Sequence, residues 1–240
     1  MTRKRILFLG ASGKIGPHLT PGLAPHYDLR LADVQPHPDG LDIAHVDVTD
    51  YEQVVAAAAG VDAIMNFTVV RGDPEQSFRV NVQGAWNVMR AAAKLGIGRV
   101  IHSGPEAVMG TYDGEFDLED APPAPGTGYY GLTKHLSRSL CREWARAHQI
   151  PTICLLFCFL GPRPERTIGR DFHRFAVVYD DLWDACRRAL ELDPVPDWYQ
   201  EVNLLSFGEH GKYSAAQARR LLHWEPAEHW EKYYRRPIDT

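Results

Sequence analysis

The chain has 240 residues, enough to bury one sizeable core with at most a small appendage. Its 26 basic and 31 acidic side chains give a formal net charge of −5 without any basic block, which argues against a nucleic-acid partner. No apolar run approaches the ~20 residues that a membrane-spanning helix needs. The four cysteines are expected to be buried, reduced thiols of a cytoplasmic protein. The histidines have no metal-ligand spacing, so we expect no metal site.

The first predicted strand leads directly into a glycine-rich turn. Residues 5–9 form an apolar run without alternation, which predicts a central parallel strand buried on both faces rather than a signal peptide. The glycines after it allow a tight turn, the approach of a pyrophosphate and the close packing of helix on strand. The start of the next helix offers N–H groups and a positive dipole end to an anion. The pattern predicts a dinucleotide-binding turn formed by Gly10, Gly13, Lys14, Ile15 and Gly16.

An acidic residue near the end of the second predicted strand bears on the choice of cofactor. This strand covers residues 27–34, and Asp33 follows the glycines by somewhat under ~20 residues. A carboxylate there can accept hydrogen bonds from an adenosine ribose and would repel a 2′-phosphate, which favours NAD over NADP. Lys14 in the turn would weaken that preference, and the alternative is a loop carboxylate without a ligand.

Strands continue to alternate with helices along the chain. Asp47 and Val48 lie at the end of a third strand, where folds of this kind often line the adenine pocket, and Asp50 is expected to cap the helix that follows. Further elements are predicted as strands over 43–48, 61–67, 98–103 and 152–160, and as helices over 51–59 and 75–95. This spacing predicts an α/β, Rossmann-type doubly wound parallel sheet.

The second half of the chain is expected to carry the substrate side. An irregular stretch runs to Gly128, where a helix begins, and the later elements are a strand over 175–178, a helix over 181–192, a strand over 202–205 and a final helix capped by Ser214. Trp224 and Trp230 are expected to pack the tail. We interpret residues 1–160 as a dinucleotide-binding domain and residues 161–240 as a small C-terminal substrate-side region packed on it in one compact unit.

Tyr130 and Lys134 are the candidate catalytic pair. They lie four residues apart on the helix after the fifth strand, so both side chains point from one helix face. A phenol has a pKa near ~10, and a nearby ammonium favours the phenolate and lowers that value. Such a pair can move a proton on a substrate hydroxyl while a nicotinamide takes or gives a hydride. The spacing alone is a frequent chance pattern, and its position in this succession of elements gives it weight.

The whole pattern resembles the extended short-chain dehydrogenase/reductase family of sugar epimerases, dehydratases and dehydrogenases. The resemblance covers nearly the whole chain, and its length and compact C-terminal part are most similar to the uronate dehydrogenase branch. It rests on the glycine turn, Asp33, Asp47-Val48, the segments 81–88 and 130–134, Gly161-Pro162, and the ending over 213–215 and 221–226.

This resemblance implies roles for particular residues. Tyr130 would be the acid/base, Lys134 would hold the nicotinamide ribose and tune Tyr130, and Asn81 would steady the ends of strands four and five beside the cofactor. It also implies a small-molecule substrate and a homodimer formed through the two long helices.

Two positions depart from the family pattern. The family's substrate-holding Ser or Thr falls on Gly104 or Pro105, and Ser103 stands one or two residues early. Because a one-residue shift turns a strand side chain to the other face, Ser103 replaces it only if the backbone bends; otherwise its hydroxyl makes a strand-end hydrogen bond. The sixth strand has an apolar run over 155–158 where relatives carry a substrate-gripping arginine, so uronate itself is not expected. Arginines that could meet an anion, or else lie in a solvated loop, are Arg163, Arg166 and Arg170.

Two functional hypotheses remain open from the sequence. The first is an NAD-dependent oxidoreductase or epimerase acting on a small sugar, sugar acid or polyol, with proton transfer by Tyr130. The second is a non-catalytic NAD-binding protein, a sensor or assembly partner, suggested by the missing Ser/Thr and the missing arginine. Detection of hydride transfer separates the two.

Overall fold

The structure is a computed structural model that describes residues 3–104, 124–157, 159–162, 176–206 and 214–227. Its centre is a parallel sheet of seven strands, with β1 (Arg5–Leu9) in the interior and the order β3-β2-β1-β4-β5-β6-β9. The other strands are β2 (Asp28–Asp33), β3 (Ala44–His45), β4 (Ala63–Asn66), β5 (Arg99–Gly104), β6 (Thr152–Leu156) and β9 (Tyr199–Asn203). The order reverses at β1, so the predicted doubly wound fold is confirmed and its ligand crevice is expected at the carboxyl ends of β1 and β4.

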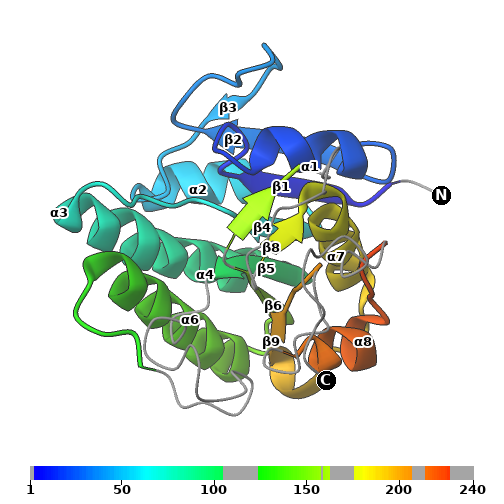
Figure 1. Ribbon diagram of the computed structural model, residues 1–240. Coiled ribbons are helices and arrows are strands. Elements are labelled where there is room, and N and C mark those ends of the chain that lie inside the picture. Colours follow the sequence, from blue (N-terminus) through cyan, green and yellow to red (C-terminus); the bar gives the residue numbers. More distant parts are fainter. Residues whose placement is uncertain (1–2, 105–123, 158, 163–175, 207–213, 228–240) are drawn as a thin grey trace.

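Helices cover both faces of this sheet (Figure 1). Residues of β1 alternate between two cores, with Ile6 and Phe8 in one and Leu7 and Leu9 in the other, which explains the unbroken apolar run. The first core contains α1 (Gly16–Leu23), α7 (Tyr179–Glu191) and α8 (Ala216–Leu222). The second contains α2 (Tyr51–Ala58), α4 (Gly84–Leu95) and α6 (Tyr129–His148).

The helix predicted over 75–95 consists of three successive helical pieces. It begins as α3 (Pro74–Ser77), capped by the Asp73 carboxylate, which accepts a hydrogen bond from the Gln76 N–H at 2.7 Å. It continues as the π-helical turn η1 (Phe78–Gln83) and then as α4. Such π-helical turns occur mostly as single turns inside α-helices, frequently at functional sites.

The third strand is much shorter than predicted. Of the predicted strand over 43–48, only the two residues of β3, Ala44 and His45, pair with β2, because the chain turns soon afterwards at Asp47. The Asp47 carboxylate accepts a hydrogen bond from the Thr49 N–H at 2.8 Å, and its carbonyl accepts one from the Asp50 N–H at 3.0 Å. The predicted cap by Asp50 is confirmed, since its side chain accepts hydrogen bonds from the N–H groups of Glu52 and Gln53.

The prediction of one strand over 152–160 was wrong. The last sheet bond of this strand runs from the Phe157 N–H to the Gly104 carbonyl at 3.0 Å, and Gly104 is the last residue of β5. β7 (Phe159–Gly161) belongs to a separate two-stranded sheet, in which it pairs with β8 (Ala176–Val178). The final strand, predicted over 202–205, begins earlier as β9 beside β6, preceded by the 3₁₀ turn η2 (Pro196–Trp198).

The C-terminal part is tied to α7 through a buried tryptophan. Trp224 is fully buried, as predicted, and its indole N–H donates to the Asp181 carbonyl at 3.0 Å. Ser214 is not the N-cap of α8; Ala215 is, and the Ser214 hydroxyl accepts a hydrogen bond from the Ala216 N–H at 3.0 Å. Trp230 lies outside the described residues.

Three of the cysteines are buried free thiols, namely Cys141, Cys154 and Cys186, and Cys158 lies outside the described residues. Burial raises the pKa of each of these three thiols, to about 12 for Cys154. Within the part of the chain that the structure describes, no helix has the length and apolar character to cross a membrane.

Candidate active site

The glycine-rich turn is built so tightly that two of its glycines have no room for a side chain. Gly10 has a φ of +86°, and a Cβ there would lie 2.7 Å from the carbonyl carbon of Phe67, just after β4. A Cβ on Gly16 would lie 2.0 Å from the Ala11 carbonyl oxygen, and one on Gly13 would lie 3.3 Å from the Gly10 oxygen. The turn therefore brings the backbones of β1, the β4 end and α1 into close contact, as expected of a dinucleotide-binding turn.

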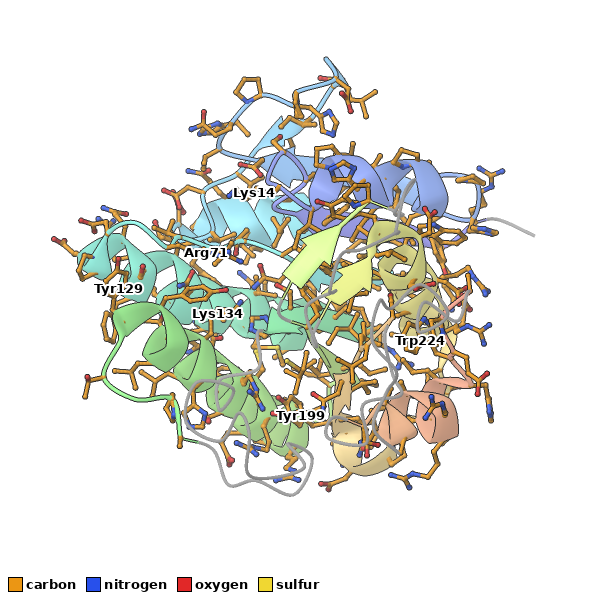
Figure 2. The ribbon with its side chains drawn as sticks, in the orientation of Figure 1. Lys14, Arg71, Tyr129, Lys134, Tyr199 and Trp224 are labelled. Atoms are coloured by element: carbon orange, nitrogen blue, oxygen red, sulfur yellow. The ribbon has the colours of Figure 1, made fainter. Side chains whose placement is uncertain are left out.

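Polar groups at this turn fit a pyrophosphate. The N-cap residue of α1, Ile15, makes no side-chain cap, so the helix start is open to an anion. Among the described residues, the buried Ser12 hydroxyl has no hydrogen-bond partner. Lys14 is exposed on the turn, and in the view of Figure 2 it lies above Arg71 and Lys134.

Asp33 faces the glycine turn from the end of β2. Its carboxylate accepts hydrogen bonds from the Ser12 N–H and the Gln35 N–H, both at 3.1 Å, and the residue is half-exposed. This arrangement anchors the carboxylate beside the turn and leaves lone pairs for a ribose. Asp47 is engaged in its own turn, and Val48 is buried with its carbonyl accepting from Asn87 at 2.9 Å.

The candidate catalytic pair occupies the first two turns of α6. Tyr130 is half-buried, and Lys134 is only 2% exposed. The Lys134 ammonium donates to the Ser103 carbonyl at 2.6 Å, which fixes it at the carboxyl end of β5. Burial, assisted by the charges of Arg71 and Arg138, lowers the pKa of Lys134 to about 8. The Lys134 side chain is therefore mainly protonated at neutral pH and loses its proton as the pH rises above about 8.

Ser103 and Gly104 lie on opposite faces of β5. The His102 side chain points toward α6, where its Nε2 contacts the Ser137 hydroxyl at 3.1 Å, so the Ser103 side chain points to the other face. A Cβ on Gly104 would point back toward α6 and meet Cys154 Sγ at 3.1 Å. The bond to Lys134 uses the Ser103 backbone, and a catalytic role for its hydroxyl stays a prediction. Pro105 lies outside the described residues.

Asn81 links the loop after β4 to the helix of the catalytic pair. It lies in η1, is buried, and its side-chain oxygen accepts from the Val70 N–H at 2.9 Å. Its amide donates to the Val70 carbonyl and to the Thr133 hydroxyl, both at 3.0 Å. The contacts of Asn81 thus join the loop after β4 to α6, and its implied role in steadying the ends of strands four and five beside the cofactor stays a prediction.

Arg71 belongs to this site and was not singled out from the sequence. Its guanidinium carbon lies 4.8 Å from the centroid of the Tyr130 ring, and its carbonyl accepts from the Tyr129 hydroxyl at 2.9 Å. The residue lies in a polar loop far from Tyr130 in sequence, and only the fold brings them together. The three arginines Arg163, Arg166 and Arg170 lie outside the described residues.

A buried ion pair supports α6 from the neighbouring strand. Arg138, one turn after Lys134, pairs with Glu201 of β9, and the Tyr199 hydroxyl donates to the same carboxylate at 2.7 Å. The Cδ of Arg138 would lie 3.2 Å from a Cβ on Gly104. Part of the space that a side chain would take at Gly104 is therefore already filled.

Comparison with known proteins agrees with this geometry. Residues 6–187 match the model of the NAD dependent epimerase/dehydratase family. A uronate dehydrogenase of Agrobacterium fabrum (strain C58) is 32% identical over 245 residues, which cover 99% of this chain and 89% of that enzyme. An NAD-dependent glucose-6-phosphate dehydrogenase of Haloferax volcanii is 24% identical over 92% of both chains.

The fold also matches a solved relative. The crystal structure of uronate dehydrogenase from Agrobacterium tumefaciens superposes with a TM-score of 0.80 at 25% identity, covering 97% of this chain and 88% of that one. The resemblance expected from the motifs is confirmed, and with it an NAD-using oxidoreductase or epimerase. The chain belongs to the NAD-dependent epimerase/dehydratase family.

Proposed function

We propose that this protein is an NAD-dependent oxidoreductase or epimerase for a small sugar, sugar acid or polyol, with Tyr130 as the proton-transfer residue. The observation that carries the proposal is the buried Lys134 held by the Ser103 carbonyl, one helical turn from Tyr130. This arrangement puts a cation and a phenol at the carboxyl edge of the sheet that also carries the glycine turn. The substrate class is suggested by relatives named for uronate and glucose 6-phosphate.

The proposed mechanism assigns separate tasks to the two residues. The Lys134 ammonium, one helical turn from Tyr130 on α6, would favour the phenolate form of Tyr130 because positive charge nearby stabilises the phenolate. The phenolate then accepts the proton of a substrate hydroxyl, and the phenol returns it in the reverse direction. NAD, when bound, supplies the hydride acceptor or donor. The glycine turn and Asp33 would hold its pyrophosphate and adenosine ribose.

A Tyr130→Phe variant tests this assignment. We expect the kcat for NADH formation to fall by about 10²- to 10⁴-fold, the contribution of a positioned acid/base, while NAD affinity by calorimetry stays unchanged. Tyr51→Phe is the matched control, because it also removes one phenol hydroxyl but on α2, where Arg90 covers its ring. Unchanged turnover in Tyr130→Phe would refute the mechanism. NAD binding without any NADH formation across sugars, sugar acids and polyols would favour the non-catalytic alternative.

Two further expectations remain proposals. Large apolar side chains are exposed on the two long helices, at Trp86 of α4 and Leu136 of α6, and these support a homodimer formed through them. The buried free thiols of the described residues support a reducing, cytoplasmic environment.

A further inference from the structure

The backbone around Arg71 is fixed by three separate elements. Before it, both polar groups of Val70 are bonded to Asn81 of η1, and the Ser77 hydroxyl of α3 also donates to the Val70 carbonyl at 3.0 Å. At Arg71 itself, the carbonyl accepts from the Tyr129 hydroxyl of α6. These bonds fix the backbone from which the Arg71 side chain reaches over the Tyr130 ring.

The guanidinium of Arg71 is available for a ligand. It is exposed, it lies over the Tyr130 ring, and among the described residues no carboxylate forms an ion pair with it. Its charge also reaches the buried amine of Lys134, whose pKa it helps to lower. In the view of Figure 2, Arg71 lies below Lys14 of the glycine turn and above Lys134 of α6.

The sixth strand, in contrast, has apolar side chains at the positions where the family pattern would place a substrate-binding arginine. The run Leu155, Leu156 and Phe157 is apolar and buried, so it offers no cation to a substrate. An arginine fork binds carboxylate and phosphate oxygens in pairs, whereas an apolar strand cannot. Among the described residues, the exposed guanidinium beside the Tyr130 ring is that of Arg71, on the loop after β4, and it could meet a substrate anion there.

We propose that Arg71 determines the substrate class by binding an anionic group, a carboxylate or a phosphate, on the sugar whose hydroxyl reacts at Tyr130. This inference rests on the proposed function, which supplies the reacting hydroxyl. The fixed loop sets the distance between the bound anion and the phenol, so the anion orients the substrate as well as adding affinity. Arg71 is thus a specificity-determining residue.

The test is a comparison of Arg71→Gln and Arg71→Lys on three substrates: a uronate, an aldose 6-phosphate and a neutral aldose. For the anionic substrate that the enzyme uses, we expect Arg71→Gln to raise KM by about 10- to 100-fold, the equivalent of one or two charged hydrogen bonds, and to lower kcat for that substrate alone, because the anion also orients it. KM for the neutral aldose stays the same. Arg71→Lys recovers part of the loss because it restores the charge without the fork. Which anion responds distinguishes carboxylate from phosphate.

Two controls separate this proposal from other roles. Arg90→Gln removes the corresponding arginine over the Tyr51 ring, 3.8 Å from its centroid, and should leave all three KM values unchanged. Equal losses of kcat on neutral and anionic substrates in Arg71→Gln would mean that Arg71 only supports Tyr130, and the proposal would fail. It would also fail if KM for every anion stayed constant.

Failure of the proposed function would look different. If the wild type turned over none of these substrates, calorimetry of the NAD-saturated protein with the same uronate and aldose 6-phosphate would still report the Arg71 site. If the anions bound to the wild type but not to Arg71→Gln, the proposed anion site would be supported while the proposed reaction would be refuted. Equal binding of the anions to wild type and Arg71→Gln would reject the anion site itself.

Discussion

The buried ammonium of Lys134 makes the stability of the protein depend on pH, and Lys134→Met is expected to remove that dependence. Burial is the main cause that lowers the pKa of this lysine from 10.5 to about 8. Between these two values the unfolded chain holds the proton and the folded chain does not. The free energy of unfolding therefore rises with pH across this window, and below it the contribution is constant.

The size of the effect follows from the shift. The difference between 10.5 and about 8 is about 2.5 pKa units, and at 1.36 kcal/mol per unit this corresponds to about 3 kcal/mol. The solvent screening that weakens such a conversion at the surface does not apply, because Lys134 is 2% exposed. Methionine has no titrating group and a similar length, so it fills the site without the charge.

Denaturant unfolding of both proteins at several pH values measures the effect. From about pH 7 to about pH 10.5, we expect the free energy of unfolding of the wild type to rise by about 3 kcal/mol relative to Lys134→Met. Lys94→Met, an exposed lysine on α4, reports the effect of losing one surface lysine and is subtracted. If the wild-type and Lys134→Met curves ran parallel, the lysine would not be desolvated and the reasoning would be wrong.

Two other substitutions test the parts that hold the site together. Gly16→Ala would place a Cβ 2.0 Å from the Ala11 oxygen and force the turn open, so we expect NAD affinity by calorimetry to fall by about tenfold or more; unchanged affinity would remove the turn from the cofactor site. Asn81→Leu leaves the Val70 N–H without its acceptor and removes the donor to the Thr133 hydroxyl, which keeps its own bond to the Tyr130 carbonyl, and we expect a loss of about 2–4 kcal/mol in urea unfolding. A loss under about 1 kcal/mol would contradict the bridging role of Asn81.

The parts of the fold that the sequence predicts well depend on local chemistry. The apolar run of β1 predicts its burial on both faces of the sheet, because neighbouring residues such as Ile6 and Leu7 enter different cores. The glycine turn is equally local, since Gly10 needs a positive φ and Gly16 contacts the backbone five residues earlier. The cap at Asp50 depends on two neighbouring N–H groups.

The parts that escaped prediction depend on distant partners. Nothing in the run 152–160 marks Leu156 as the end of β6, whose described pairing with β5 runs to Gly104. The same applies to Arg71, whose place over Tyr130 follows from bonds made by Asn81 and Tyr129 across the fold. The local sequence around a polar loop residue does not predict which aromatic side chain it will contact in the fold.

The two departures from the family pattern have a common consequence for how a substrate would be held. A hydroxyl at the end of β5 would position a substrate relative to the sheet, but the space beside Gly104 is taken by Cys154 and Arg138. Under the two proposals, Arg71 positions the substrate instead. The Arg71 carbonyl is bonded to Tyr129 of α6, the helix that also carries Tyr130. The positions of the bound anion and of the proton acceptor would therefore both be fixed relative to α6. The distance between them would then be insensitive to changes at the end of β5, one of the two positions where a departure from the family pattern is expected.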